Sequence, residues 1–383
     1  MWGHAMLSGA HSASARLPMQ PPVERLAFLD GLRGWAALAV LLYHVFALGF
    51  PPNAFAKSEL SKIVLFNGPY AVKLFFAISG VSLSLPYFAR PTAQTFVRLA
   101  SGRYFRLAIP VFALCFLVQI AMLAGWPVPV DERPAVFREI LNFDPTWGHL
   151  LGFGLFDVFL QYDKTQTYAG PLWTMQIEFT GSLFVLLLLF LLPSRRLRIG
   201  ACALLAAILS AIGSDMAFFV IGLLIAGHIG SLSAGGMRHL APIALFCGVV
   251  GPILVPALRL GGFMDGFCTM AAPVLLLIGV IGTPAMRGFL SNRVSRVLGH
   301  LSFPLYLIHG PILFLLGIRM AVGQQGLGLF MVDCGLVLMS ILAAAAFAPV
   351  NGLGIAISRR VGRVASARFA IDPSSISRPA QKR

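Results

Sequence analysis

Charged side chains are scarce in this chain. Only 11% of its 383 residues are charged and 58% are hydrophobic, whereas a soluble domain averages about 25% charged and about 45–50% apolar residues. The 29 basic and 14 acidic residues are too few to cover the surfaces of the soluble domains that this length would otherwise suggest. The composition therefore predicts an integral membrane protein.

Acidic residues are scarcer than basic ones, and the formal net charge is +15. A charge of this size could indicate a nucleic-acid-binding protein. Most of the basic residues, however, stand in short runs beside apolar segments, which is the pattern that orients membrane proteins. We therefore expect no nucleic-acid partner.

Patterns typical of disulfides, metal sites and leader peptides are also missing. The five cysteines form no CxxC pair, and no His or Cys stands at metal-ligand spacing. We interpret the cysteines as small core residues and expect no metal. Residues 1–28 contain no apolar stretch of signal-peptide length, so the first apolar segment is expected to remain in the mature protein. No internal repeat of the kind found in many transporters is visible.

Long apolar runs fill most of the chain. A membrane-crossing helix needs about 20 mostly apolar residues. Ten stretches are candidates for such helices: 29–50, 70–90, 106–126, 172–193, 197–213, 215–233, 240–258, 267–284, 301–320 and 327–349. The sequence predicts an all-α, polytopic helical bundle with about ten transmembrane helices.

Charge tests this count independently of hydropathy. With ten spans and both termini in the cytoplasm, most basic residues fall on the inner side. Merging the two short spans that meet at residues 213–215 would move Arg238, residues 287–296 and the basic C-terminal residues to the outside. The positive-inside rule therefore favours ten spans.

Three segments are expected outside the bundle. Residues 1–28 form a cytoplasmic N-terminal segment. Residues 127–170 hold six of the 14 acids and form the one long external loop, in which the apolar run 150–160 is interpreted as an interfacial helix. Residues 351–383 form a basic cytoplasmic tail that is expected to be disordered and to touch anionic lipid.

Ionisable side chains inside predicted spans require a reason, because a charge in a bilayer is costly. Arg33 and His44 are eleven residues apart, which is three helical turns plus about 20°, so both share one face at a separation of about 16 Å. We place Arg33 near the inner surface and His44 in the outer half. The alternative is an anchoring arginine and a histidine that hydrogen-bonds between helices.

Further ionisable groups fall at two depths. Arg103 and Arg106 stand at i and i+3, where both guanidinium groups could clamp a phosphate or could simply anchor the helix at the inner surface. Glu178 and His309 are expected with His44 in one outer-half pocket, away from the inner arginines. This separation suggests an anionic cofactor held inside and acid–base chemistry further out. Asp333 and His228 are interpreted as structural.

The order of these motifs resembles that of a known family. Residues 29–34 (Leu-Asp-Gly-Leu-Arg-Gly) followed by His44 resemble the Arg-x10-His signature of the membrane acyltransferase type 3 family. The family's other blocks follow in order: residues 75–80, the pair Arg103 and Arg106, residues 173–178 and residues 299–309. The resemblance covers residues 25–350 and implies a transmembrane acyltransferase domain over 29–350.

The resemblance assigns roles to individual residues. His44 would be the catalytic histidine, as general base or transient acyl carrier, with Arg33 as its partner and Glu178 orienting or tuning a histidine. Residues implied in binding the donor acyl-CoA are Arg33, Ser79, Arg103 and Arg106. Residues implied in binding the acceptor are Asp30, Trp173, Tyr306 and His309.

The function implied is O-acylation, most often O-acetylation, of a hydroxyl on a cell-surface glycan or exopolysaccharide, with cytoplasmic acyl-CoA as donor. The expected location is the inner membrane of a bacterium, and the expected partners are acyl-CoA, the acceptor and the lipid bilayer, with a homo-oligomer left open. Acylation of a lipid headgroup or an antibiotic is a variant of this hypothesis. The competing hypotheses are a carrier or exporter and an inert scaffold.

Overall fold

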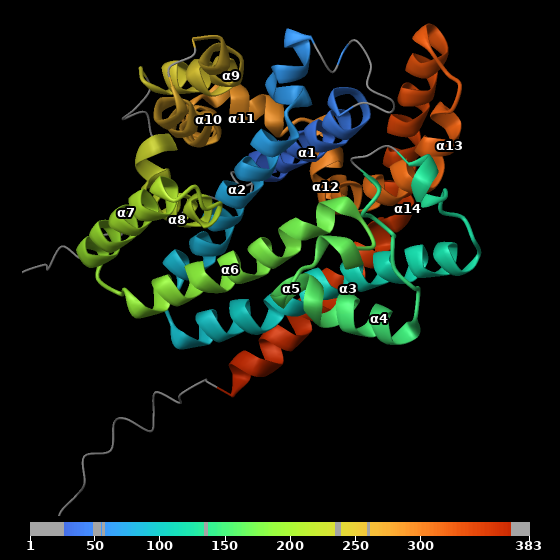
Figure 1. Ribbon diagram of the computed structural model, residues 1–383. Coiled ribbons are helices and arrows are strands. Elements are labelled where there is room, and N and C mark those ends of the chain that lie inside the picture. Colours follow the sequence, from blue (N-terminus) through green and yellow to red (C-terminus); the bar gives the residue numbers. More distant parts are fainter. Residues whose placement is uncertain are drawn as a thin grey trace, which may run out of the picture.

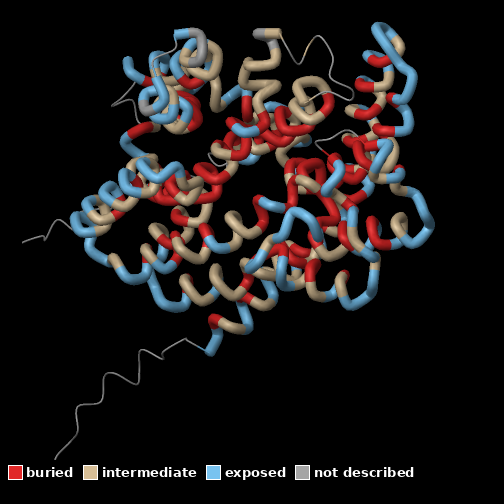
Figure 2. The backbone as a smooth tube through the Cα atoms, in the orientation of Figure 1, coloured by how far each residue is buried: buried red, intermediate tan, exposed pale blue. Residues whose placement is uncertain are grey.

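The computed structural model describes residues 27–48, 55, 58–133, 137–233, 239–258 and 261–368. Within these residues the regular structure is helical, without any β-strand. Figure 1 shows the helices gathered in one bundle, and Figure 2 shows the buried positions running through its interior. An all-α membrane protein, as predicted from composition, is therefore confirmed.

Seven helices in the described part of the chain are long and apolar enough to cross a membrane. They lie in α2 (Gly68–Ala89), α3 (Ala93–Leu123), α6 (Trp173–Leu191), α8 (Met216–Ser233), α10 (Gly262–Gly282), the continuous pair α12 and α13 (Arg293–Ile312 and Ile318–Ala321) and α14 (Gly326–Ala367). Each coincides with a predicted span, although several extend beyond it.

The other three predicted spans coincide with shorter or more polar helices. These are α1 (Ala27–Leu42), α7 (Arg195–Ala211) and α9 (Ala241–Leu258). Asp30, Arg33 and His44 lower the hydropathy of the first, which continues through a π-helical turn at Tyr43–Ala47. The count of ten and the cytoplasmic position of both termini stay predictions.

Two helices extend beyond their predicted spans because they pack against each other. The side chain of Thr92 caps α3, so that this helix begins at Ala93. α14 continues to Ala367, and a Cβ atom at Gly362 would lie 2.5 Å from the carbonyl oxygen of Arg98 on α3. The expectation of disorder from residue 351 is thus wrong for residues 351–367, and residues 369–383 lie outside the described residues.

Close backbone packing fixes α1 against α12. A Cβ atom at Gly34 would lie 2.3 Å from the backbone of Leu298, and one at Gly299 would lie 2.5 Å from the carbonyl oxygen of Asp30. Small residues allow such approach in membranes, where dispersion contacts replace the hydrophobic effect between helices. This contact sets the relative position of the polar residues on the two helices.

The region predicted as an external loop contains a helix that packs lengthwise along α3. It comprises α4 (Trp147–Gly152), a π-helical turn (Phe153–Asp157) and α5 (Val158–Leu160). The ring centres of Trp147 and Phe116 lie 6.3 Å apart, and the Tyr104 hydroxyl donates a hydrogen bond of 2.7 Å to the Leu155 carbonyl. That the run 150–160 lies at the membrane interface stays a prediction.

The same region also covers one end of α12. The rings of Phe137 and Phe314 meet edge to face at 5.0 Å, and Pro171 packs against Gly310. The buried guanidinium of Arg133 donates a hydrogen bond to the carbonyl of Val128. The described residues of segment 127–172 therefore contribute buried side chains to the packed core.

Candidate active site

A polar cavity of about 280 Å³ opens between α1, α2, α3, α6 and α12. Its walls combine three arginines and two carboxylates with hydroxyl groups and aromatic rings. The ionisable residues of the lining are Asp30, Arg33, Arg103, Arg106 and Glu178. With all five groups ionised, one positive charge remains uncompensated, so the cavity favours an anion.

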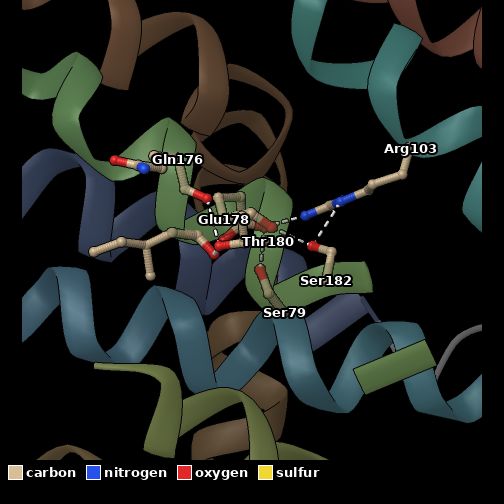
Figure 3. A network of polar contacts seen from close by, with 7 residues as sticks. Ser79, Arg103, Gln176, Glu178, Thr180 and Ser182 are labelled. Atoms are coloured by element: carbon tan, nitrogen blue, oxygen red, sulfur yellow. Dashed lines mark hydrogen bonds and ion pairs between the residues drawn. The ribbon is translucent and has the colours of Figure 1, made fainter. Parts of the chain in front are cut away.

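Glu178 is the centre of a hydrogen-bond network that joins three helices (Figure 3). The Arg103 guanidinium forms an ion pair with Oε1 of Glu178, and its Nε donates 2.8 Å to the Ser182 hydroxyl. The Ser79 hydroxyl donates 2.8 Å to the same carboxylate oxygen. Charge-assisted bonds of this kind are short and directional, so the network holds α2, α3 and α6 together.

This arrangement differs from the predicted one, in which Glu178 joined the histidines in the outer half. α6 begins beside the middle of α3, because the helix Trp147–Leu160 occupies the space along the rest of it. The side chain of Gln176 donates 3.0 Å to the carbonyl of Leu160, where the two segments meet. Glu178 is thereby brought to the level of Arg103, and its placement with the histidines is wrong.

The other two arginines have different partners. Arg106 donates 2.6 Å to the side-chain oxygen of Asn351 on α14, and its guanidinium lies 5.6 Å from the ring centre of Phe303. Arg33 pairs with Asp30 at 3.4 Å, with the carboxylate 65% exposed. The structure thus brings together the three arginines that the sequence grouped. Asn351, which holds Arg106, was missed because an asparagine carries no charge to mark it.

His44 and His309 face each other away from the arginines, with ring centres 5.0 Å apart. Nδ1 of His44 lies 2.8 Å from the carbonyl of Val40, and Nδ1 of His309 lies 2.9 Å from that of Leu305. A carbonyl only accepts hydrogen bonds, so each Nδ1 carries the proton and each neutral ring keeps its Nε2 lone pair. Nε2 of His309 is buried and has no partner among the described residues.

Both histidines stand beside π-helical turns. His44 lies within the turn Tyr43–Ala47, and Leu313–Gly317 follows His309 by one helical turn. Such wide turns are frequent at functional sites. The prediction that Arg33 and His44 share one face assumed 100° of rotation per residue, and the π-helical turn at His44 departs from that value. Within the described residues, neither His44 nor His309 lines the cavity that Arg33 lines.

Tyr306 stands between the cavity and the histidine pair. Its ring lines the cavity and lies 6.0 Å, centre to centre, from the ring of His309. Its hydroxyl is 2.8 Å from the hydroxyl of Thr174. Tyr306 therefore contacts both the arginine-lined cavity and one member of the histidine pair.

Of the remaining predicted site residues, two line the cavity and one lies outside it. Ser79 and Asp30 line the cavity, together with Ser302 and Thr174, which sequence reasoning did not single out. Trp173 is 40% exposed and does not contribute to the lining of this cavity.

Comparison with known proteins identifies the family of the chain. The profile of a family described as an acyltransferase domain matches residues 26–349. The chain is 26% identical over 362 residues to the O-acetyltransferase PaAT-1 of Phomopsis amygdali, covering 76% of this chain and 73% of that protein. No solved structure matches the chain. Because the matched profile spans most of its length, this protein belongs to the acyltransferase 3 family.

Proposed function

We propose that this protein takes an acyl group, most often acetyl, from acyl-CoA and transfers it to a hydroxyl of a cell-surface glycan. The observation that supports the proposal most directly is the arginine-lined cavity, together with Tyr306, which lines it and lies beside His309 of the histidine pair. The location proposed is the inner membrane of a bacterium, with both termini in the cytoplasm.

The chemistry of the cavity fits the donor's phosphates. Arginine binds phosphate through paired N–H donors, and Arg106 has neutral contacts in Asn351 and Phe303. Arg103 and Arg33 are held by carboxylates, so a bound phosphate would compete with Glu178 and Asp30. Arg106 would therefore supply the first contact.

The acyl-CoA donor supplies a thioester carbon that is open to nucleophilic attack. In the proposed reaction His44 Nε2 accepts the proton of the acceptor hydroxyl as its oxygen bonds to that carbon. The carbon–sulfur bond breaks, and the proton leaves with the thiol, so ester and free CoA balance the substrates. The alternative, in which His44 briefly carries the acyl group, uses the same lone pair.

The experiment is turnover of radiolabelled acetyl-CoA by the purified protein in lipid nanodiscs, with a crude extract of cell-surface glycans as acceptor. We expect label in the glycan fraction with the natural chain and none with His44→Ala. Label in a lipid or small-molecule fraction would support the transferase activity but show that the acceptor is not a glycan. A folded protein that labels nothing with any acyl-CoA would overturn the proposal.

A further inference from the structure

A second basic site lies away from the cavity just described. A groove of about 390 Å³ is formed where the end of α2 meets the start of α7 and the end of α8. Its polar lining residues are Arg195, Arg198, His228 and Ser231. It shares no residue with the arginine-lined cavity, so its ligand must be sought separately.

The groove's cations are held in place without an acidic partner. The guanidinium of Arg198 lies 4.9 Å from the ring centre of Phe88, and its Nη1 donates 3.0 Å to the carbonyl of Leu192. Nδ1 of His228 lies 3.0 Å from the carbonyl of Leu224, which leaves Nε2 for another partner. Arg198 is thus oriented in the groove by neutral groups, and His228 can donate to an anion when its Nε2 carries a proton.

The sequence supplies no counter-ion nearby. No Asp or Glu occurs at residues 60–130, 179–214 or 216–264, and these ranges include the whole of α2, α7 and α8. Asp215 lies at the opposite end of the α7–α8 hairpin, about 25 Å away at 1.5 Å per helical residue. The three helices that form the groove therefore supply no anion of their own at this end.

The other wall of the groove is apolar. Ile199, Leu223 and Leu224 line it, and α7 exposes Leu197 and Leu204. The groove lies at the ends of α2 and α8, two helices long and apolar enough to cross a membrane, and the ends of such helices reach the lipid headgroups. A ligand that fits has an anionic head beside the basic groups and hydrocarbon chains along the helices.

We infer that this groove binds the phosphate of an anionic membrane phospholipid, with Arg195, Arg198 and His228 around the headgroup. The test is native mass spectrometry of the full chain titrated with phosphatidylglycerol or with phosphatidylcholine. We expect one tight phosphatidylglycerol adduct and no comparable phosphatidylcholine adduct. Excess glycerol 3-phosphate should not displace the lipid; equal competition would overturn a lipid ligand in favour of a soluble phosphate.

Matched variants separate the groove from general surface charge. Arg195→Gln should weaken the adduct about fivefold, since a basic residue near an anionic lipid surface contributes about 1 kcal/mol. Arg196→Gln removes the same charge one residue away, outside the groove lining, and should weaken it far less. Equal weakening by the two variants would overturn the inference. His228→Gln gives a second arm if Arg195→Gln fails to fold, as judged by helical circular dichroism.

Discussion

Arg103 and Glu178 form an ion pair between α3 and α6, with each side chain 14% exposed. Removing one partner of such a pair leaves a charge with little solvent around it, whereas removing both does not. Glu178→Gln should therefore destabilise the protein by about 3 kcal/mol, the low end of the range for a buried pair because each side chain keeps some exposure, measured as loss of thermal stability in detergent.

The double variant Arg103→Met with Glu178→Gln is the matched control. We expect it to recover much of the stability lost in Glu178→Gln while remaining inactive. If the double variant loses as much stability as Arg103→Met and Glu178→Gln lose together as single variants, the ion pair does not stabilise the bundle.

The histidine pair predicts a graded loss of activity. His44→Ala should lower turnover at least about 100-fold, the range expected when a general base is lost. His309→Gln should lower it as well, because its ring lies 5.0 Å from that of His44 and its buried Nε2 has no other partner among the described residues. His300→Ala is the control, since His300 is exposed on the same helix. An active His44→Ala protein would reject the mechanism.

Replacing Arg106 should weaken binding of the acyl-CoA donor and leave the acyl-transfer step less affected. Arg106→Gln should raise the KM for acyl-CoA about tenfold or more, because a charge-assisted phosphate contact is lost, and kcat should change less. Steady-state kinetics at two salt concentrations measure this. Arg90→Gln, at an exposed position at the end of α2, should leave KM unchanged; a fall in kcat alone would contradict the assigned role of Arg106.

The close contact between α1 and α12 leaves no room for a side chain at Gly34. Gly34→Val should prevent the two helices from meeting, with a loss of at least about 3 kcal/mol, since overpacking alone costs about 1–3 kcal/mol and here the clash is with backbone. Size-exclusion profiles of the detergent-solubilised protein would show aggregation. Gly352→Ala, where a Cβ atom meets open space, should leave the profile unchanged.

Tyr306 can be tested without removing its ring. Tyr306→Phe deletes the hydroxyl that pairs with Thr174 and should cost about 1 kcal/mol of stability, the usual net value of one hydrogen bond. Thr174→Val also removes the hydrogen bond from Thr174 to the Pro171 carbonyl, so the coupling between the two hydroxyls is the difference between the loss in the double variant and the sum of the two single losses. Thermal unfolding of the single and double variants measures this coupling, and fully additive losses would show that the hydroxyls do not interact.

The sequence predicted the helical bundle and the grouping of Arg33, Arg103 and Arg106 because long apolar runs and intramembrane charges are local signals. It misplaced Glu178 because depth was counted from the start of a span. That count assumes that every span begins at the membrane surface. The helix Trp147–Leu160 breaks this assumption, and its packing against α3 depends on contacts distant in sequence.

The extent of α14 shows the same limit. Its last turns are rich in arginine, and composition alone indicates a solvated tail. Their helical structure depends on close contact with the start of α3, where Gly102 and Gly362 admit the opposing backbone. The proximity of His44 and His309 likewise depends on how α1 packs against α12. The sequence of either helix alone does not specify this packing.

The packing of segment 127–172 on Gly310 and Phe314 bears on how this enzyme's acceptor range can be altered. A chimera that receives this segment from a relative will also reposition the helix that holds His309. Segment and helix therefore have to be exchanged together, and the long loop is not a module that can be transplanted on its own.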